Sequence, residues 1–153
     1  MGMKKILHQS GKGNSTSDGM DIAICAFNKE MNLLEYAGAN RPIWIIRNGN
    51  SAIEETKATK AAIGGYTTDE QEFIKHKISL QKNDTIYLFS DGFADQFGVT
   101  ENKKLKTRKF KEAILENINK SMSDQKTNLD SFMENWKGNM EQTDDILVIG
   151  IRV

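Results

Sequence analysis

Short apolar segments separated by turn residues fill the first third of the chain. They occupy residues 20–28, 32–39 and 42–49 and are rich in Ile, Leu, Ala and aromatic residues. Segments of this length and composition are typical of β-strands. The connection 28–32 is short enough for a hairpin, and Asn48-Gly49 is a dipeptide that closes hairpins or ends strands. The pattern therefore predicts three consecutive antiparallel strands.

The spacing of apolar residues changes twice in the rest of the chain. Residues 51–72 are polar and contain Gly64-Gly65, which predicts an irregular connection. Apolar and polar residues alternate over 73–80, and an apolar run follows the turn 81–84, which predicts another hairpin. Helical spacing over 106–120 and 128–137 predicts two amphipathic helices. The continuous apolar run that ends the chain, after Asp144-Asp145, predicts a buried central strand.

Strands followed by helices indicate an α+β layered domain. The length of 153 residues suits one domain, and a hydrophobic fraction of 38% is typical of a globular protein. Residues 1–19 are predicted to form a flexible stub and loop, because Gly, Ser, Asn and Asp dominate after a short basic apolar piece. Residues 20–153 form the predicted domain.

Charge and cysteine content exclude several classes of protein. Lys plus Arg and Asp plus Glu both number 21, so bulk charge gives no attraction to nucleic acid or to an anionic membrane. The single Cys25 excludes an internal disulfide framework and a cysteine-rich zinc site. No apolar run approaches the ~18 residues of a membrane span, and the first residues are too polar for a signal peptide. We expect a cytoplasmic protein.

Carboxylates occur at the ends of two strands that are predicted to be buried. Asp91-Gly92 follows one of them, and Asp144-Asp145 precedes the other. A carboxylate at a strand end is held by rigid backbone, which suits a metal ligand. The alternatives are a turn or helix cap for Asp91 and a polar strand terminator for Asp144 and Asp145. The two positions converge only if the strands are neighbours, and the sequence does not show this.

The side-chain types at these positions indicate which metal ion would bind and which reaction it would support. Carboxylate oxygens without paired His or Cys favour Mg²⁺ or Mn²⁺ over zinc. Such ions activate a water that attacks phosphorus. A phosphotransferase with an Asp nucleophile two residues before Asp91 is excluded, because that position is Phe89. We therefore assign no residue of this chain as a covalent catalyst.

Other polar residues have both a structural and a functional interpretation. Arg41 could contact phosphate or be a solvated residue beside Pro42, and Gly64-Gly65 could approach a ligand or simply be flexible. His76 alternates with lysines and is expected to be exposed or at a sheet edge. The basic stretch 103–111 could bind an acidic partner, although a solvated helix face is the preferred interpretation. Trp44 and Trp136 are expected to anchor the core.

Four segments together resemble a known family. They are EYAGANRPIWIIR, AAIGGY, DTIYLFSDGFADQFG and QTDDILVIGIRV. These segments resemble bacterial metal-dependent serine/threonine protein phosphatases of the stage II sporulation protein E type. The resemblance runs from about Asp18 to Val153, and SDGF followed by TDDI at this separation is its most specific part.

The resemblance implies a fold, a reaction and a set of ligands. The fold is an α/β/β/α sandwich of two antiparallel sheets, with two Mn²⁺ or Mg²⁺ ions in a carboxylate cleft. A water that bridges the metals attacks a phosphoserine or phosphothreonine of a regulatory protein without forming a phosphoenzyme. Asp91 and Asp144 match metal ligands of the family. Gly92, Asp145 and Asn40 match positions that border the cleft.

The chain also departs from the family pattern. Strands with a Gly-Asp motif and an Asp-Gly pair, which supply further ligands in the family, do not occur before Asp18, and Asp18-Gly19 matches a later loop. We therefore expect a sandwich that is incomplete at its N-terminus, binds metal weakly or not at all, and has little or no activity by itself. We also expect self-association through exposed sheet. The alternative function is a non-catalytic interaction or regulatory module.

Overall fold

The computed structural model of this chain describes residues 18–68, 70–100 and 102–153. The predicted stub over 1–19 lies outside the described residues except for Asp18 and Gly19, and Gly19 already belongs to a strand. The chain divides into two compact units. The first unit runs to Ile43 and includes 55–80, and the second consists of 44–54 and 81–153.

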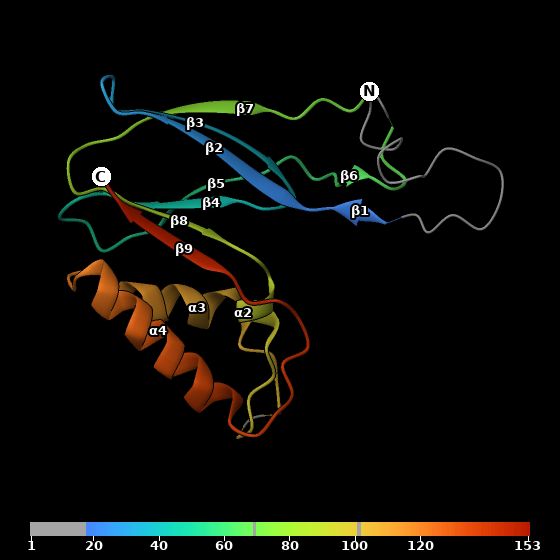
Figure 1. Cartoon of the computed structure of the whole chain (residues 1–153), viewed down its shortest axis with the longest axis vertical. Helices are drawn as coiled ribbons and strands as arrows, with labels where there is room; N and C mark the ends of the chain where they lie inside the picture. Colours follow the sequence, from blue (N-terminus) through green and yellow to red (C-terminus); the bar gives the residue numbers. More distant parts are fainter. Residues whose placement is uncertain (1–17, 69, 101) are drawn as a thin grey trace. The chain divides into compact units, whose positions relative to one another are not determined.

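The first unit contains a three-stranded antiparallel sheet in the order β2-β3-β7 (Figure 1). Its strands are β2 (Ile22–Asn28), β3 (Leu33–Ala39) and β7 (Lys75–Ser79). The hairpin predicted at 28–32 is confirmed, because β2 pairs with β3 from Ile22↔Ala39 to Asn28↔Leu33. Two short strands, β1 (Gly19–Met20) and β6 (Ile63–Gly64), pair separately.

Most of a four-stranded sheet in the order β5-β4-β8-β9 belongs to the second unit, although Ile43 and residues 55–56 are assigned to the first. Its strands are β5 (Glu54–Thr56), β4 (Ile43–Ile46), β8 (Thr85–Phe89) and β9 (Val148–Arg152). The helices of this unit are α2 (Gly92–Asp95), α3 (Lys106–Leu115) and α4 (Met122–Lys137). Helices α3 and α4 lie together on one side of β8 and β9 (Figure 1). The predicted α+β class with antiparallel sheets is confirmed.

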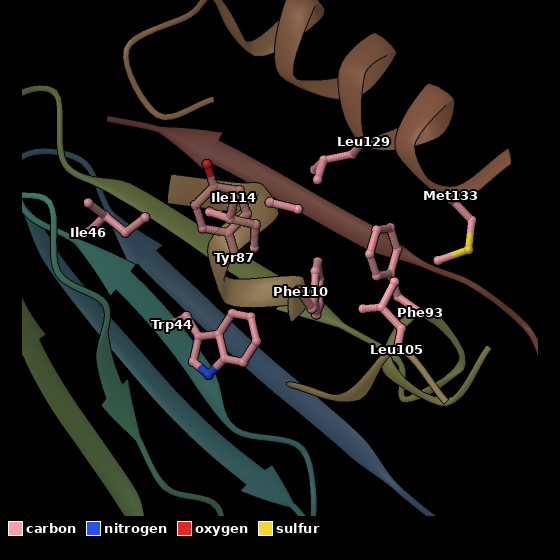
Figure 2. Close-up of a cluster of buried hydrophobic side chains, with 10 residues drawn as sticks. Trp44, Ile46, Tyr87, Phe93, Leu105, Phe110, Ile114, Leu129 and Met133 are labelled. Atoms are coloured by element: carbon pink, nitrogen blue, oxygen red, sulfur yellow. The ribbon is translucent and has the colours of Figure 1, made fainter. Parts of the chain in front are cut away.

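Aromatic side chains join the helices of the second unit to its sheet (Figure 2). Phe110 of α3 is completely buried, and its ring lies 5.1 Å from that of Trp44 and 4.2 Å from that of Phe93. Leu129 and Met133 extend the cluster along α4. The prediction that Trp44 anchors the core is confirmed, and Trp136 packs against the cluster from its edge. Burial of this apolar face holds both helices on the sheet.

Two predicted strand pairings are wrong. The third predicted strand, β4, leaves the sheet of β2 and β3 and lies between β5 and β8. The segments at 73–80 and 84–92 do not form a hairpin, because β7 pairs with β3 whereas β8 pairs with β4 and β9. The turn between them is built on the buried Asp84, which accepts hydrogen bonds from the Asn48 amide and the Arg47 side chain. These bonds tie the start of β8 to the end of β4 rather than to β7.

The last strand is also placed differently from the prediction. Among the described strands, β9 is at an edge of its sheet and pairs with β8, and Ile149 and Ile151 are exposed. The connection 51–72 contains the short strands β5 and β6. The helix predicted over 106–120 ends at Leu115, and the helix predicted from 128 begins at Met122. Ser121 determines that earlier start, because its hydroxyl accepts a hydrogen bond from the Asp124 amide at 3.1 Å.

Within the described ranges, none of the helices has the length and apolar character needed to cross a membrane.

Candidate metal site

Strands β8 and β9 bring the predicted aspartates to one end of the sheet. The strands are antiparallel, with Phe89 opposite Val148, so the end of β8 lies beside the start of β9. The Ser90 amide extends the pairing by donating to the Leu147 carbonyl at 3.0 Å. The structure therefore shows that the two strands are neighbours, which the sequence left open, and that Asp91 and Asp144 follow and precede paired segments.

Ser90 fastens this junction with its side chain. Its hydroxyl donates to the Asp145 carbonyl at 2.7 Å and accepts from the Leu147 amide at 2.9 Å. The Ser90 hydroxyl therefore takes the place of two backbone hydrogen bonds between the strands at this point. Sequence reasoning assigned Ser90 no role. The available signal was a small hydroxyl residue directly after a buried strand and directly before Asp91-Gly92.

Gly92 permits close approach of the two chain segments. The residue is buried, and a Cβ atom added there would lie 2.4 Å from the carbonyl oxygen of Asp145. Any side chain would have to displace this backbone. This close approach explains why the position is glycine, and the places of Gly92 and Asp145 at a cleft stay predictions.

Asp91 is half-buried and occupies the N-cap position of the short helix α2. Its carbonyl accepts from the Asp95 amide at 2.9 Å, but its side chain makes no capping hydrogen bond. The helix-cap alternative therefore accounts for the backbone of Asp91 and not for its carboxylate.

Asp144 and Asp145 are exposed. One carboxylate oxygen of Asp144 accepts from the Asp145 amide at 2.7 Å, which orients the side chain, and Gln142 donates to the Asp144 carbonyl at 2.9 Å. These carboxylates and that of Asp91 supply the oxygen donors that Mg²⁺ and Mn²⁺ prefer. In residues 18–68, 70–100 and 102–153, no three or more His, Cys, Asp or Glu side chains are grouped to hold a metal ion. The ligand roles of Asp91 and Asp144 stay predictions.

Asn40 belongs to the first unit, whereas the aspartates belong to the second. Its backbone has a φ of 55°, and its side chain donates to Asp21 at 2.8 Å. Arg41 pairs with the other oxygen of the same carboxylate at 2.9 Å. Asp21 therefore fixes the loop that carries both residues. The place of Asn40 at a cleft stays a prediction, and the guanidinium of Arg41 is already engaged by a carboxylate.

The remaining candidates have structural explanations. His76 lies in the edge strand β7, as predicted, and stacks on Tyr36 with ring centroids 5.7 Å apart. Burial raises the pKa of the Cys25 thiol to about 11, so this cysteine is protonated at neutral pH. Gly64 and Gly65 have φ values of 80° and 60°, and the Gly64 carbonyl accepts from the Thr67 amide in a turn.

The basic stretch 103–111 is partly neutralised by its neighbours. Lys104 pairs with Asp95 at 2.8 Å, and Arg108 pairs with Glu112 at 3.7 Å. The ammonium group of Lys109 lies 4.1 Å from the ring centroid of Trp136, and that of Lys111 lies 4.9 Å from that of Trp44. These contacts agree with the interpretation of a helix face that packs on one side and is solvated on the other.

Comparisons with known proteins connect this arrangement to one family. The family profile described as stage II sporulation protein E matches residues 4–153. The chain is similar to the solved SiaA-PP2C domain of Pseudomonas aeruginosa, with a TM-score of 0.82 and 21% identity over 98% of this chain and 57% of that one. No curated protein sequence matches.

Two further solved structures have the same fold. The manganese-presoaked phosphatase domain of the cell fate determinant SpoIIE from Bacillus subtilis gives a TM-score of 0.63 and 14% identity, covering 99% of this chain and 63% of that one. RsbX in complex with magnesium gives a TM-score of 0.55 and 14% identity, covering 86% and 55%. This chain therefore spans somewhat more than half the length of these structures.

Proposed function

This chain belongs to the stage II sporulation protein E family, and we propose that it is part of a Mn²⁺- or Mg²⁺-dependent protein serine/threonine phosphatase domain. The observation that carries the proposal is the adjoining pair of strand ends, which sets Asp91 next to the segment of Asp144 and Asp145. The family and the PP2C-type fold support the reaction class.

Asp91 and Asp144 are the residues that would hold the metal. When bound, Mn²⁺ or Mg²⁺ supplies Lewis acidity and an activated water for attack on phosphorus. The residues of this chain position the acidic side chains. Ser90 and Gly92 keep the two acidic segments at a fixed separation, and rigid strands carry them. The substrate that we propose is a phosphoserine or phosphothreonine in a regulatory protein.

We further propose that the 153-residue chain has little or no activity by itself. Two carboxylates leave a divalent ion mostly hydrated, and Mg²⁺ gives up its water reluctantly. A site of this kind has weak occupancy. Additional ligands would come from a part of the phosphatase domain that this chain does not contain, in line with the 57% of the SiaA-PP2C domain that it covers.

The test is hydrolysis of p-nitrophenyl phosphate with Mn²⁺. It compares this chain with a fusion in which the uncovered part of the Pseudomonas aeruginosa SiaA-PP2C domain is joined to its N-terminus. We expect turnover from the fusion only, and a loss of at least roughly 100-fold in Asp91→Asn and Asp144→Asn fusions, because each removes a charged ligand. Equal turnover by chain and fusion would overturn the proposed incompleteness. Turnover that survives both substitutions would overturn the site.

A non-catalytic interaction module is the second candidate function. The observation that favours it is the exposed apolar surface of β9, which suits binding more than chemistry. A folded fusion that binds Mn²⁺ through neither aspartate and hydrolyses no phosphate ester would support this alternative.

A further inference from the structure

The connection from α4 to β9 contains an exposed segment without regular secondary structure, residues 141–145. Within the described residues, two hydrogen bonds fasten this segment to other elements. The Gln96 side chain donates to the Glu141 carbonyl at 3.0 Å, and the Ser90 hydroxyl donates to the Asp145 carbonyl at 2.7 Å. The candidate metal ligand in this segment therefore lies between two fixed points.

Both donors belong to the segment 90–96, which also carries Asp91. Ser90 directly precedes Asp91, and Gln96 is the C-cap residue of α2. The connection from α4 to β9 passes beside α2 (Figure 1). Asp144 lies three residues after one of the bonded carbonyls and one residue before the other. The segment of one candidate ligand thus holds the segment of the other at both ends.

Gln96 is itself held in place by its backbone and by burial. It is 1% exposed, and its amide donates to the Gly92 carbonyl at 3.0 Å. Its carbonyl accepts from the Leu105 amide and from the Trp136 indole, both at 3.0 Å. These bonds tie Gln96 to α2, to the residue that precedes α3 and to the last turn of α4. A donor fixed in this way can determine where the segment that it binds lies.

The side-chain amide of Gln96 has only one favourable orientation. Its Nε2 donates to the Phe97 carbonyl at 3.2 Å as well as to the Glu141 carbonyl, so a reversed amide would turn Oε1 toward two carbonyl oxygens. Oε1 is buried and has no hydrogen-bond partner among the described residues. A buried acceptor without a partner lowers stability, and an apolar side chain of the same size would avoid that loss. Stability alone therefore does not explain a glutamine at this position.

Gln125 is a buried glutamine of the same unit with a purely structural set of contacts. It is 2% exposed, and its Nε2 donates to the carbonyls of Ile118 and Lys120, both at 3.2 Å. Its Oε1 accepts from the Tyr87 hydroxyl, so its amide is satisfied on both sides. None of these bonds reaches residues 141–145. Gln125 is therefore a matched control for Gln96.

We propose that Gln96 is a positioning residue for Asp144. Its hydrogen bond to the Glu141 carbonyl limits the motion of residues 141–145 and keeps the segment of Asp144 beside that of Asp91. Gln96 acts through the backbone and does not itself bind the metal. The inference rests on the proposed function, because it takes Asp144 as a metal ligand. Residues that hold the ligands of a metal site typically change its affinity by about 10- to 100-fold.

NMR relaxation of the metal-free chain tests whether Gln96 orders the segment. Gln96→Met keeps the length of the side chain and removes both donors. We expect the backbone order parameters of residues 142–145 to drop toward the ~0.6 that is typical of flexible backbone. Gln125→Met removes two comparable bonds and should leave these order parameters unchanged, and circular dichroism shows that each variant is folded. Unchanged order in Gln96→Met, or an equal drop in both variants, overturns the proposal.

The parent chain offers a measurement that needs no substitution. The Gln96 side-chain amide protons should exchange with solvent at least ~10-fold more slowly than those of the exposed Gln142, because they are buried and hydrogen-bonded. Equally fast exchange of the two side chains would mean that the bond to Glu141 is not maintained in solution, and it overturns the proposal.

A Mn²⁺ titration connects the ordered segment to the metal site. We expect a Mn²⁺ dissociation constant about 10-fold weaker for Gln96→Met and an unchanged one for Gln125→Met. Parent-like binding in Gln96→Met, together with lost binding in Asp144→Asn, overturns the positioning role and leaves the proposed metal site intact. Parent-like binding in Asp144→Asn overturns the metal site itself and the positioning role with it, so the two failures are distinguishable.

Discussion

Strands β8 and β9 have nearly the same hydrophobicity and very different surroundings. Each has five residues, and Ile86 of β8 lies directly opposite Ile151 of β9. Ile86 is 2% exposed, whereas Ile151 is 46% exposed. In the part of the chain that the structure describes, β8 has a neighbouring strand on each side and β9 has one. An apolar run therefore predicts a strand, but the number of its neighbours decides how much of it is buried.

The ends of the two strands differ as well. The fully buried Asp84 precedes β8, and Ser90 and Asp91 follow it, so hydrogen bonds fix both ends of the strand. β9 pairs with β8, and its Arg152 guanidinium donates to the carbonyls of Ile118 and Lys120 in the connection between α3 and α4. The comparison implies that stability depends chiefly on β8, while β9 supplies a surface and one half of the acidic junction.

Substitutions of the paired residues Ile86 and Ile151 should show the largest difference in stability between the two strands. Ile86→Ala should lower the free energy of unfolding by about 3–4 kcal/mol, because it leaves a cavity in a packed site. Ile151→Ala should cost under about 1 kcal/mol, because half of that side chain already contacts water. Urea denaturation of both variants measures the values. Equal losses would show that β9 is as buried as β8.

Substitution of Asp84 tests whether its hydrogen bonds hold the start of β8 in place. Burial by itself raises the pKa of this carboxyl, but hydrogen bonds from the amides of Gln81 and Asn48 and from the Arg47 side chain hold it below its ordinary value. Asp84→Asn should destabilise the protein by about 2–3 kcal/mol, because a buried charge-assisted pair is broken.

The pH dependence of this contribution has a definite sign. A lowered pKa in the folded state means that the stabilisation is fully present above the unfolded-state pKa, whose ordinary value is 3.8, and is lost as the pH falls through the lower folded-state pKa. Denaturation at neutral pH and below pH 3.8 measures it. The difference between parent and Asp84→Asn should shrink in acid, and a difference that is constant with pH would contradict this account.

Gly92→Ala tests the close approach between the end of β8 and the start of β9. The new Cβ atom meets the Asp145 carbonyl, so the two segments must separate, at a cost of about 2 kcal/mol. Hydrogen exchange should show faster exchange of the Ser90 and Leu147 amides. Ala94→Gly, in the same short helix, is the control and should leave this exchange unchanged. Unaltered exchange in Gly92→Ala would mean that the approach is not tight in solution.

Ser90→Ala is the smallest of these changes. It removes the hydroxyl that bonds to Asp145 and Leu147, which should cost about 1 kcal/mol. Ser90→Thr keeps the hydroxyl and should recover most of the loss. Thermal unfolding of the three proteins measures the effect, and a loss shared equally by the Thr variant would indicate packing rather than hydrogen bonding.

Local pattern predicted the elements well and their pairing poorly. The hairpin of β2 and β3 follows from a short connection and was predictable. The change from the sheet of β7 to the sheet of β8 across residues 81–84 was not predictable, because it depends on long-range hydrogen bonds that Asp84 accepts from Arg47 and Asn48. Position at the strand ends predicted the aspartates as candidate ligands. Their adjacency required knowledge that β8 and β9 are neighbours, and the contribution of Ser90 became visible only in that pairing.

The most direct test of the proposed metal site is a Mn²⁺ titration of the chain, followed by electron paramagnetic resonance of the free ion. We expect weak binding, in the roughly millimolar range typical of a site with few charged ligands, and its loss in both Asp91→Asn and Asp144→Asn. Asp130→Asn, which changes an acidic residue of α4, should bind like the parent chain. Binding that persists in both variants at the end of β8 and the start of β9 would contradict the account.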